Sequence, residues 1–270
     1  MSRPANRITG HLTGLTPAAA TNPNELPLIT TIIPTTANSP TLDSVIAAIN
    51  RQTQPTNIII VDTGSAIEDY QNLEERMAQL DNVQLIRIAP QNWSHQSQPV
   101  ATALDLATAI TQTPFIFLTH DDVWIKNQNL LKELITRHLI TGSPVIGYEM
   151  SSRSHLTEQW RGMVSHTATL LVTKRIRELN LRWSLLDALK MPECENHGPG
   201  WPDTETAFGL RMKQLNLTPH FIGHETNEPH FEDDHLVHRR SLTSHRLLNP
   251  QLATTDLDWQ TTQIKNFETK

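Results

Sequence analysis

Short apolar runs alternate with segments of helical periodicity through the first half of the chain. The runs are rich in β-branched and aromatic residues and end at proline or polar clusters, which predicts strands buried in a sheet covered on both faces. The segments between them repeat apolar residues at helical spacing, which predicts amphipathic helices. The expected strands are residues 28–33, 57–61, 83–88 and 115–118, and the expected helices are residues 41–52, 67–80 and 101–110. This strand, helix, strand order predicts an α/β fold with a mostly parallel, Rossmann-like sheet.

The second half of the chain is less regular. Its expected elements are helices at residues 130–139, 175–189 and 205–215, and strands at residues 144–150, 168–172 and 219–223. No clear periodicity follows residue 224. We therefore expect a flexible leader over residues 1–24, one domain over residues 25–224 with halves at 25–124 and 125–224, and a C-terminal extension over residues 225–270.

Composition and charge exclude several classes of protein. The chain has 270 residues and a formal net charge of −6, with no basic block, so we expect no nucleic-acid surface. The single cysteine, Cys194, cannot form an internal disulfide, which fits a reducing compartment. No stretch approaches the roughly 18–20 apolar residues of a membrane span. The first residues also lack the apolar core of a secretory signal, so we expect a soluble, cytoplasmic protein.

A polar cluster directly follows the expected strand at residues 115–118. Thr119, His120, Asp121 and Asp122 place two carboxylates and an imidazole at the carboxyl edge of the sheet, where open α/β sheets bind ligands. Hard oxygen ligands of this kind suit Mg²⁺ or Mn²⁺. The simpler interpretation is a solvated turn.

Two further acidic sites lie at the ends of expected elements. Asp62 ends the strand at residues 57–61 and is followed by Gly64 and Ser65, which suits hydrogen bonding to a ribose or a base edge. Asp203 follows a loop rich in Gly and Pro and is a candidate general base, or simply the N-cap of the next helix. Glu205, two residues later, would point in a different direction from Asp203 once the helix begins, and would hold the acceptor.

Four histidines lie in the last part of the chain, at His230, His235, His238 and His245. Their spacing does not match a metal site, so a structural or subunit-contact role is an equal alternative.

Three segments resemble the family 2 glycosyltransferases, inverting enzymes with the GT-A fold that use a nucleotide sugar. TTIIPTTANSPTLDSVIAAINRQTQPTNIIIVDTGS resembles the first βαβ unit of that family, FIFLTHDDVW its metal-binding strand end, and WPDTETAFGLRMKQLNLTPHFIGH its catalytic segment. The resemblance covers roughly residues 28–224. It implies a nucleotide-binding half at residues 25–124 and an acceptor-binding, catalytic half at residues 125–224.

The resemblance also implies roles for individual residues. Asp121 matches the last acid of the Asp-x-Asp metal motif, with Asp122 and His224 as further metal ligands. Asp203 matches the catalytic base, with Glu205 beside it. The implied donor-binding residues are Pro34, Asn38, Asp62, Ser65, His120 and Asp121. Thr119 departs from the pattern, because an acid commonly stands there.

The expected function is metal-assisted transfer of a sugar from a nucleotide-diphosphate donor, UDP-linked, to a glycan or other hydroxyl acceptor, with Mn²⁺ or Mg²⁺ as cofactor. A nucleotidyltransferase is the alternative among enzymes, although the loop after the first strand lacks the glycines and the Lys or Arg that would hold a triphosphate. A non-catalytic module that binds sugar nucleotides or glycans is the alternative from another class, and Thr119 favours it.

Overall fold

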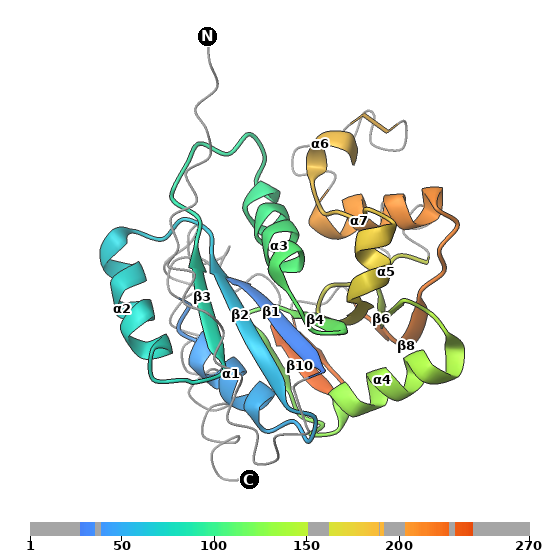
Figure 1. The fold of residues 1–270 in the computed structure, drawn as a ribbon, viewed down its shortest axis with the longest axis horizontal. Coiled ribbons are helices and arrows are strands. Elements are labelled where there is room, and N and C mark those ends of the chain that lie inside the picture. Colours follow the sequence, from blue (N-terminus) through green and yellow to red (C-terminus); the bar gives the residue numbers. More distant parts are fainter. Residues whose placement is uncertain are drawn as a thin grey trace.

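A seven-stranded, mixed and mostly parallel sheet forms the centre of the molecule (Figure 1). The computed structural model describes residues 28–35, 39–150, 162–188, 190–191, 203–226 and 230–239. The strand order is β3-β2-β1-β4-β7-β6-β8. The strands are β1 (Ile29–Thr35), β2 (Thr56–Asp62), β3 (Val83–Arg87), β4 (Phe115–Thr119), β6 (Val145–Met150), β7 (Ala168–Val172) and β8 (His220–Glu225). The α/β class with helices flanking a mostly parallel sheet is confirmed.

The first four of these strands in sheet order run parallel, as the βαβ pattern predicts. β7 is antiparallel to both β4 and β6, whereas β6 and β8 are parallel. β7 therefore runs back from the edge at which β4 ends, so residues just before β7 lie beside the polar cluster that follows β4.

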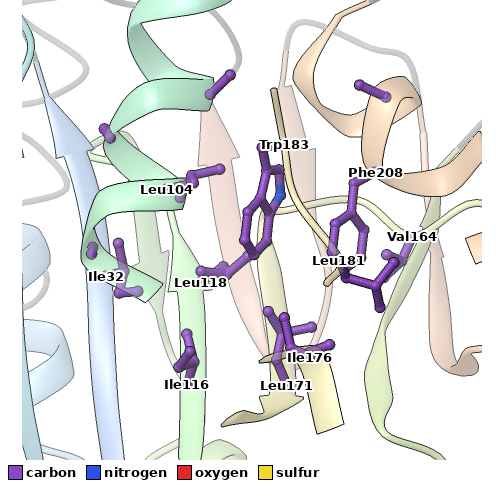
Figure 2. Packing of buried hydrophobic residues seen from close by; sticks show 14 of the residues in the cluster. Ile32, Leu104, Ile116, Leu118, Val164, Leu171, Ile176, Leu181, Trp183 and Phe208 are labelled. Atoms are coloured by element: carbon purple, nitrogen blue, oxygen red, sulfur yellow. The ribbon is translucent and has the colours of Figure 1, made fainter. Parts of the chain in front are cut away.

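Helices cover both faces of the sheet, and alternating strand residues pack against them. The helices are α1 (Leu42–Asn50), α2 (Ile67–Met77), α3 (Gln98–Ile110), α4 (Leu130–Thr141), α5 (Thr173–Glu178), α6 (Leu185–Ala188) and α7 (Thr204–Gln214). One core cluster joins the sheet to α3, α5, α6 and α7, and Figure 2 shows Trp183 within it, near Leu104 and Phe208. The second cluster joins the other face to α1, α2 and α4. None of the helices in the described part of the chain has the length and apolar character needed to cross a bilayer.

A second, three-stranded sheet contributes apolar residues to the second core cluster. Its order is β5-β10-β9, from β5 (Val123–Ile125), β10 (Leu236–Arg239) and β9 (His230–Glu232). β5 begins directly after Asp122, so the C-terminal strands lie beside the end of β4. The domain boundary expected after residue 224 falls inside β8, and residues 230–239 pack with the domain.

Two element predictions differ from the structure. β1 continues through Pro34 to Thr35, because its pairing with β4 ends at Ile32 and a missing donor two residues later is tolerated. The single helix expected at residues 175–189 is two helices, α5 and α6. Asn180 has φ +50° and breaks the helix between them.

Candidate active site

The carboxyl ends of β1, β2 and β4 bring their polar residues to one edge of the sheet. Thr35 Oγ1 donates a hydrogen bond to Asp121 Oδ2 at 2.7 Å, and Thr41 Oγ1 donates to the Asp121 carbonyl. Thr41 holds the N-cap position of α1, but its hydroxyl bonds this carbonyl instead of capping the helix. Asp62 is the register partner of Thr35 on the neighbouring strand. Asp62 and Asp121 therefore lie on either side of β1.

Asp62 is fully buried and already has a hydrogen-bond partner. The Ser65 hydroxyl donates to Oδ1, and the Ser65 amide donates to Oδ2 at 3.3 Å. Burial raises the pKa of Asp62, and the hydrogen bonds from Ser65 offset part of that shift. A ligand at this strand end would share the carboxylate with Ser65.

Asp121 and Asp122 are both buried, and their charges act on each other. Burial raises the pKa of Asp121 to about 7, and the neighbouring charge of Asp122 adds to the shift. The hydrogen bond from Thr35 lowers it in part. A buried pair of carboxylates with this property is stabilised by any cation that binds between them or beside them.

His238 supplies one positive charge from β10. Its Nδ1 lies 2.5 Å from Glu225 Oε1, and its Nε2 lies 3.5 Å from Asp122 Oδ1. Burial alone would lower the pKa of His238, but the bonds to Asp122 and Glu225 raise it to about 9. The ring also stacks on His120, with 5.8 Å between the ring centroids. Sequence reasoning gave His238 no specific role, because only the pairing of β10 with β5 brings it to the site.

The structure does not bring His224 to the Asp121–Asp122 turn. His224 lies on β8, which is three strands from β4 in the order of the sheet. Its side chain is 78% exposed and pairs with Glu149 at 2.8 Å. Its neighbour Glu225 is fully buried and reaches the site, because successive strand residues point to opposite faces.

The two acids expected to be catalytic lie at the start of α7. Asp203 is the N-cap, and its Oδ1 accepts bonds from the amide and the hydroxyl of Thr206. Glu205 Oε1 accepts from the His166 amide at 2.7 Å and from Ser165 Oγ at 3.1 Å. The helix cap and the segment before β7 thus hold both carboxylates in defined positions.

One hydrogen-bond chain connects the start of α7 to the turn after β4. Ser165 Oγ bonds Glu205 and lies 2.9 Å from Thr167 Oγ1, which donates to Glu225 Oε2 at 2.8 Å. Glu225 then bonds His238, which faces Asp122. Glu205, Glu225 and Asp122 therefore belong to one polar cluster.

The structure also places two other residues that the sequence analysis singled out, Thr119 and Pro34. Thr119 is buried, and its hydroxyl donates to the Thr167 carbonyl at 2.9 Å, so here it ties β4 to the segment before β7. Pro34 is a buried residue of β1. Asn38 and the histidine at 245 lie outside the described residues.

The structure offers two carboxylates, and no further protein ligand among the described residues, for a divalent cation. Among the described residues, no three His, Cys, Asp or Glu side chains are arranged to hold a metal ion. Asp121 and Asp122 still offer adjacent hard oxygen atoms. Mg²⁺ is commonly held by one or two carboxylates together with substrate phosphates, and this pair fits that arrangement.

Comparison with solved structures shows that the chain shares the GT-A fold. S. aureus TarS matches with a TM-score of 0.50 at 15% identity, over 77% of this chain and 36% of that chain. TarS 1-349 in complex with UDP matches with a TM-score of 0.51 at 15% identity, over 77% of this chain and 59% of that chain. The mannosyltransferase PcManGT from Pyrobaculum calidifontis, in complex with GDP-Man and Mn²⁺, matches with a TM-score of 0.48 at 16% identity, over 73% of this chain and 55% of that chain.

The sequence matches the model of Glycosyl transferase family 2 over residues 30–185, and the chain belongs to that family. No curated protein sequence matches it. The chain spans between 36% and 59% of the length of the two TarS structures.

Proposed function

We propose that the protein transfers a sugar from a nucleotide-diphosphate donor, UDP-linked, to the hydroxyl of a glycan or other acceptor, with inversion and with the help of Mn²⁺ or Mg²⁺. One observation carries the proposal. In a family 2 chain, Glu205 at the start of α7 is linked by hydrogen bonds to Asp122 after β4, at the edge of the sheet where α/β folds bind nucleotides, and Asp203 lies two residues before Glu205. The enzyme would act in the cytoplasm as a soluble protein.

The donor would lie across the carboxyl ends of β1, β2 and β4. Asp62, with Ser65, would accept hydrogen bonds from the nucleoside, and His120 would lie beside the diphosphate with Pro34 and Asn38 along the first strand and loop. A divalent cation held by Asp121 and Asp122 would neutralise charge on the diphosphate as it leaves. His238 already balances part of the negative charge of this turn. UDP is the first nucleotide to test, because it is bound in one solved structure of the same fold.

The start of α7 would carry the proton transfer. The acceptor oxygen attacks the anomeric carbon as the bond to the diphosphate breaks, and the proton of the acceptor hydroxyl passes to Asp203. A single displacement of this kind inverts the anomeric centre. Glu205, held by Ser165 and the His166 amide, would hold the acceptor.

Isothermal titration of UDP tests the donor site directly. We expect tight binding in Mn²⁺ or Mg²⁺ and binding weakened at least tenfold in EDTA, because the Asp121–Asp122 pair repels an unscreened diphosphate. The matched variant Asp43→Asn changes an acid on the exposed side of α1 and should bind UDP like the parent. Equal affinity with and without the cation contradicts metal assistance, and the absence of any nucleotide binding contradicts the proposed function.

One observation favours a second candidate, a non-catalytic module that binds sugar nucleotides. Thr119 stands at the position of the first acid of the metal motif, and its hydroxyl donates a hydrogen bond to the Thr167 carbonyl. Release of UDP from a UDP-sugar over time separates the two candidates. A protein that binds the nucleotide sugar but never cleaves it, with a range of acceptors, is the module.

A further inference from the structure

His166 is a buried histidine that the proposed reaction does not yet use. It lies just before β7 and is 1% exposed. One ring nitrogen has a clear partner, because Trp183 Nε1 lies 3.0 Å from His166 Nε2. The other nitrogen, Nδ1, is buried and has no hydrogen-bond partner among the described residues.

The contact with Trp183 determines which nitrogen carries the proton. An indole N–H can only donate a hydrogen bond, so His166 Nε2 must be the unprotonated acceptor. In a neutral imidazole the proton is then on Nδ1. Burial lowers the pKa of His166 to about 3, so the ring is neutral at physiological pH. His166 therefore presents a single N–H donor in a fixed tautomer.

The surroundings of the ring indicate which way this donor faces. Trp183 and Phe208 stack at 4.7 Å between their centroids, and both rings meet His166 edge to face at 5.9 and 5.7 Å. The two nitrogens of an imidazole point in nearly opposite directions, so Nδ1 faces away from Trp183. The charges of His120 and Asp203 both act on the ring. The backbone amide of His166 donates to Glu205 Oε1 at 2.7 Å, and its neighbours Ser165 and Thr167 form the hydrogen-bond chain that leads to Glu225. His166 thus lies along the connection between the start of α7 and the turn after β4.

We propose that the Nδ1–H of His166 donates a hydrogen bond to a hydroxyl oxygen of the transferred sugar, and that His166 positions this sugar between the diphosphate and Asp203. The inference rests on the proposed function, because the sugar is the part of the donor that joins those two groups. A buried donor without a partner is costly, and a bound sugar hydroxyl would satisfy it. Trp183 is then a positioning residue, since it fixes the tautomer without touching the ligand.

Two substitutions separate the two nitrogens of the ring. In His166→Gln the longer amide can still accept from Trp183, but it loses the donor at the Nδ1 position. In His166→Asn the shorter amide keeps a donor near the Nδ1 position and loses the contact with Trp183. His138→Gln is the matched control, because His138 lies on α4 and bonds the Ser143 carbonyl at 2.8 Å.

The measurement is the ratio of the dissociation constant of a nucleotide sugar to that of the matching nucleotide. We would titrate UDP-N-acetylglucosamine against UDP, and GDP-mannose against GDP, in Mn²⁺. We expect His166→Gln to raise the ratio about 3- to 10-fold for the donor that the protein uses, the loss typical of one hydrogen bond, while the affinity for the nucleotide itself is unchanged. His166→Asn and His138→Gln should keep the parental ratio.

The outcomes distinguish this inference from the proposed function. If the parent protein binds none of the nucleotides or nucleotide sugars, the proposed function fails. If the parent binds them and His166→Gln keeps the parental ratio, or if the Gln and Asn variants change it equally, the sugar contact is wrong. Should His166→Gln not fold, Trp183→Phe keeps the stacking on Phe208 and frees the tautomer. It must then raise the same ratio, and an unchanged ratio overturns the inference.

Discussion

Asp203 has two roles to separate, the observed N-cap of α7 and the proposed acceptor of a proton. Its Oδ1 accepts from the Thr206 amide, a bond that any Asx side chain could accept. Capping therefore needs the shape of the side chain, whereas proton transfer needs its charge. This difference makes the two roles separable by substitution.

Asp203→Asn should remove turnover and leave donor binding nearly intact. The amide keeps the cap but cannot accept a proton, so we expect a loss of about 10²- to 10⁴-fold in kcat, as for a general base. The measurement is turnover of a nucleotide sugar beside a binding isotherm for the same variant. Asp203→Glu should also fail, because an added methylene moves the carboxylate relative to the acceptor oxygen. Parental turnover in Asp203→Asn would reduce Asp203 to a cap and make Glu205 the next candidate.

At the scale of elements, the strands and helices in the first half of the chain could be predicted from sequence. The short strands β9 and β10 could not. The strands at Ile29–Thr35, Thr56–Asp62 and Phe115–Thr119 are apolar runs whose pattern arises from burial on both faces. β9 and β10 are only three and four residues long, with histidine and charged residues among the apolar ones. β10 pairs with β5 and β9 pairs with β10, contacts that local patterning does not encode.

The residues of the candidate site also divide into those that could be placed from sequence and those that could not. Asp62, Asp121 and Asp122 stand at strand ends, so the topology rule placed them at one edge. His238 and Glu225 could not be placed from sequence, because their position depends on which distant strand β10 pairs with. His224 and Glu225 are adjacent in sequence, and only the orientation of β8 decides which of them is buried.

Leu236 tests whether the C-terminal strands belong to the core. It is fully buried in β10, so Leu236→Ala should lower the free energy of unfolding by about 2–5 kcal/mol. Leu215→Ala is the control, because Leu215 is 42% exposed and its loss should cost about 0.5 kcal/mol or less. Urea titrations of both variants give the comparison. A Leu236→Ala variant as stable as Leu215→Ala would show that β10 is not part of the cooperative unit.

At the scale of the whole molecule, His166 makes stability depend on pH. Its folded-state pKa of about 3 lies below the unfolded value of about 6.5, so the unfolded chain binds one more proton between these limits. The stability that the neutral ring contributes is present above pH ~6.5 and is lost as the pH falls.

The free energy of unfolding should therefore fall between pH 6 and pH 4 more steeply in the parent than in His166→Gln, by up to about 1.4 kcal/mol per pH unit. Urea titrations at several pH values, with His138→Gln as the control, measure the difference in slope. Parallel curves for the parent and His166→Gln would show that His166 is not held neutral by burial.

The three-stranded sheet must form before the polar cluster is complete, because β10 carries His238 to the turn at Asp122. The backbone amide of Arg239 donates to the carbonyl of Asp122, and His238 beside it balances the charge of the same turn. These partners are far apart in sequence, and contacts of this kind form late because the loop between them must close first. During synthesis the segments that bear Asp62 and Asp121 leave the ribosome long before β10 does. The growing chain thus carries its acids without the counter-charge of His238, and nucleotide binding would report that β10 has docked.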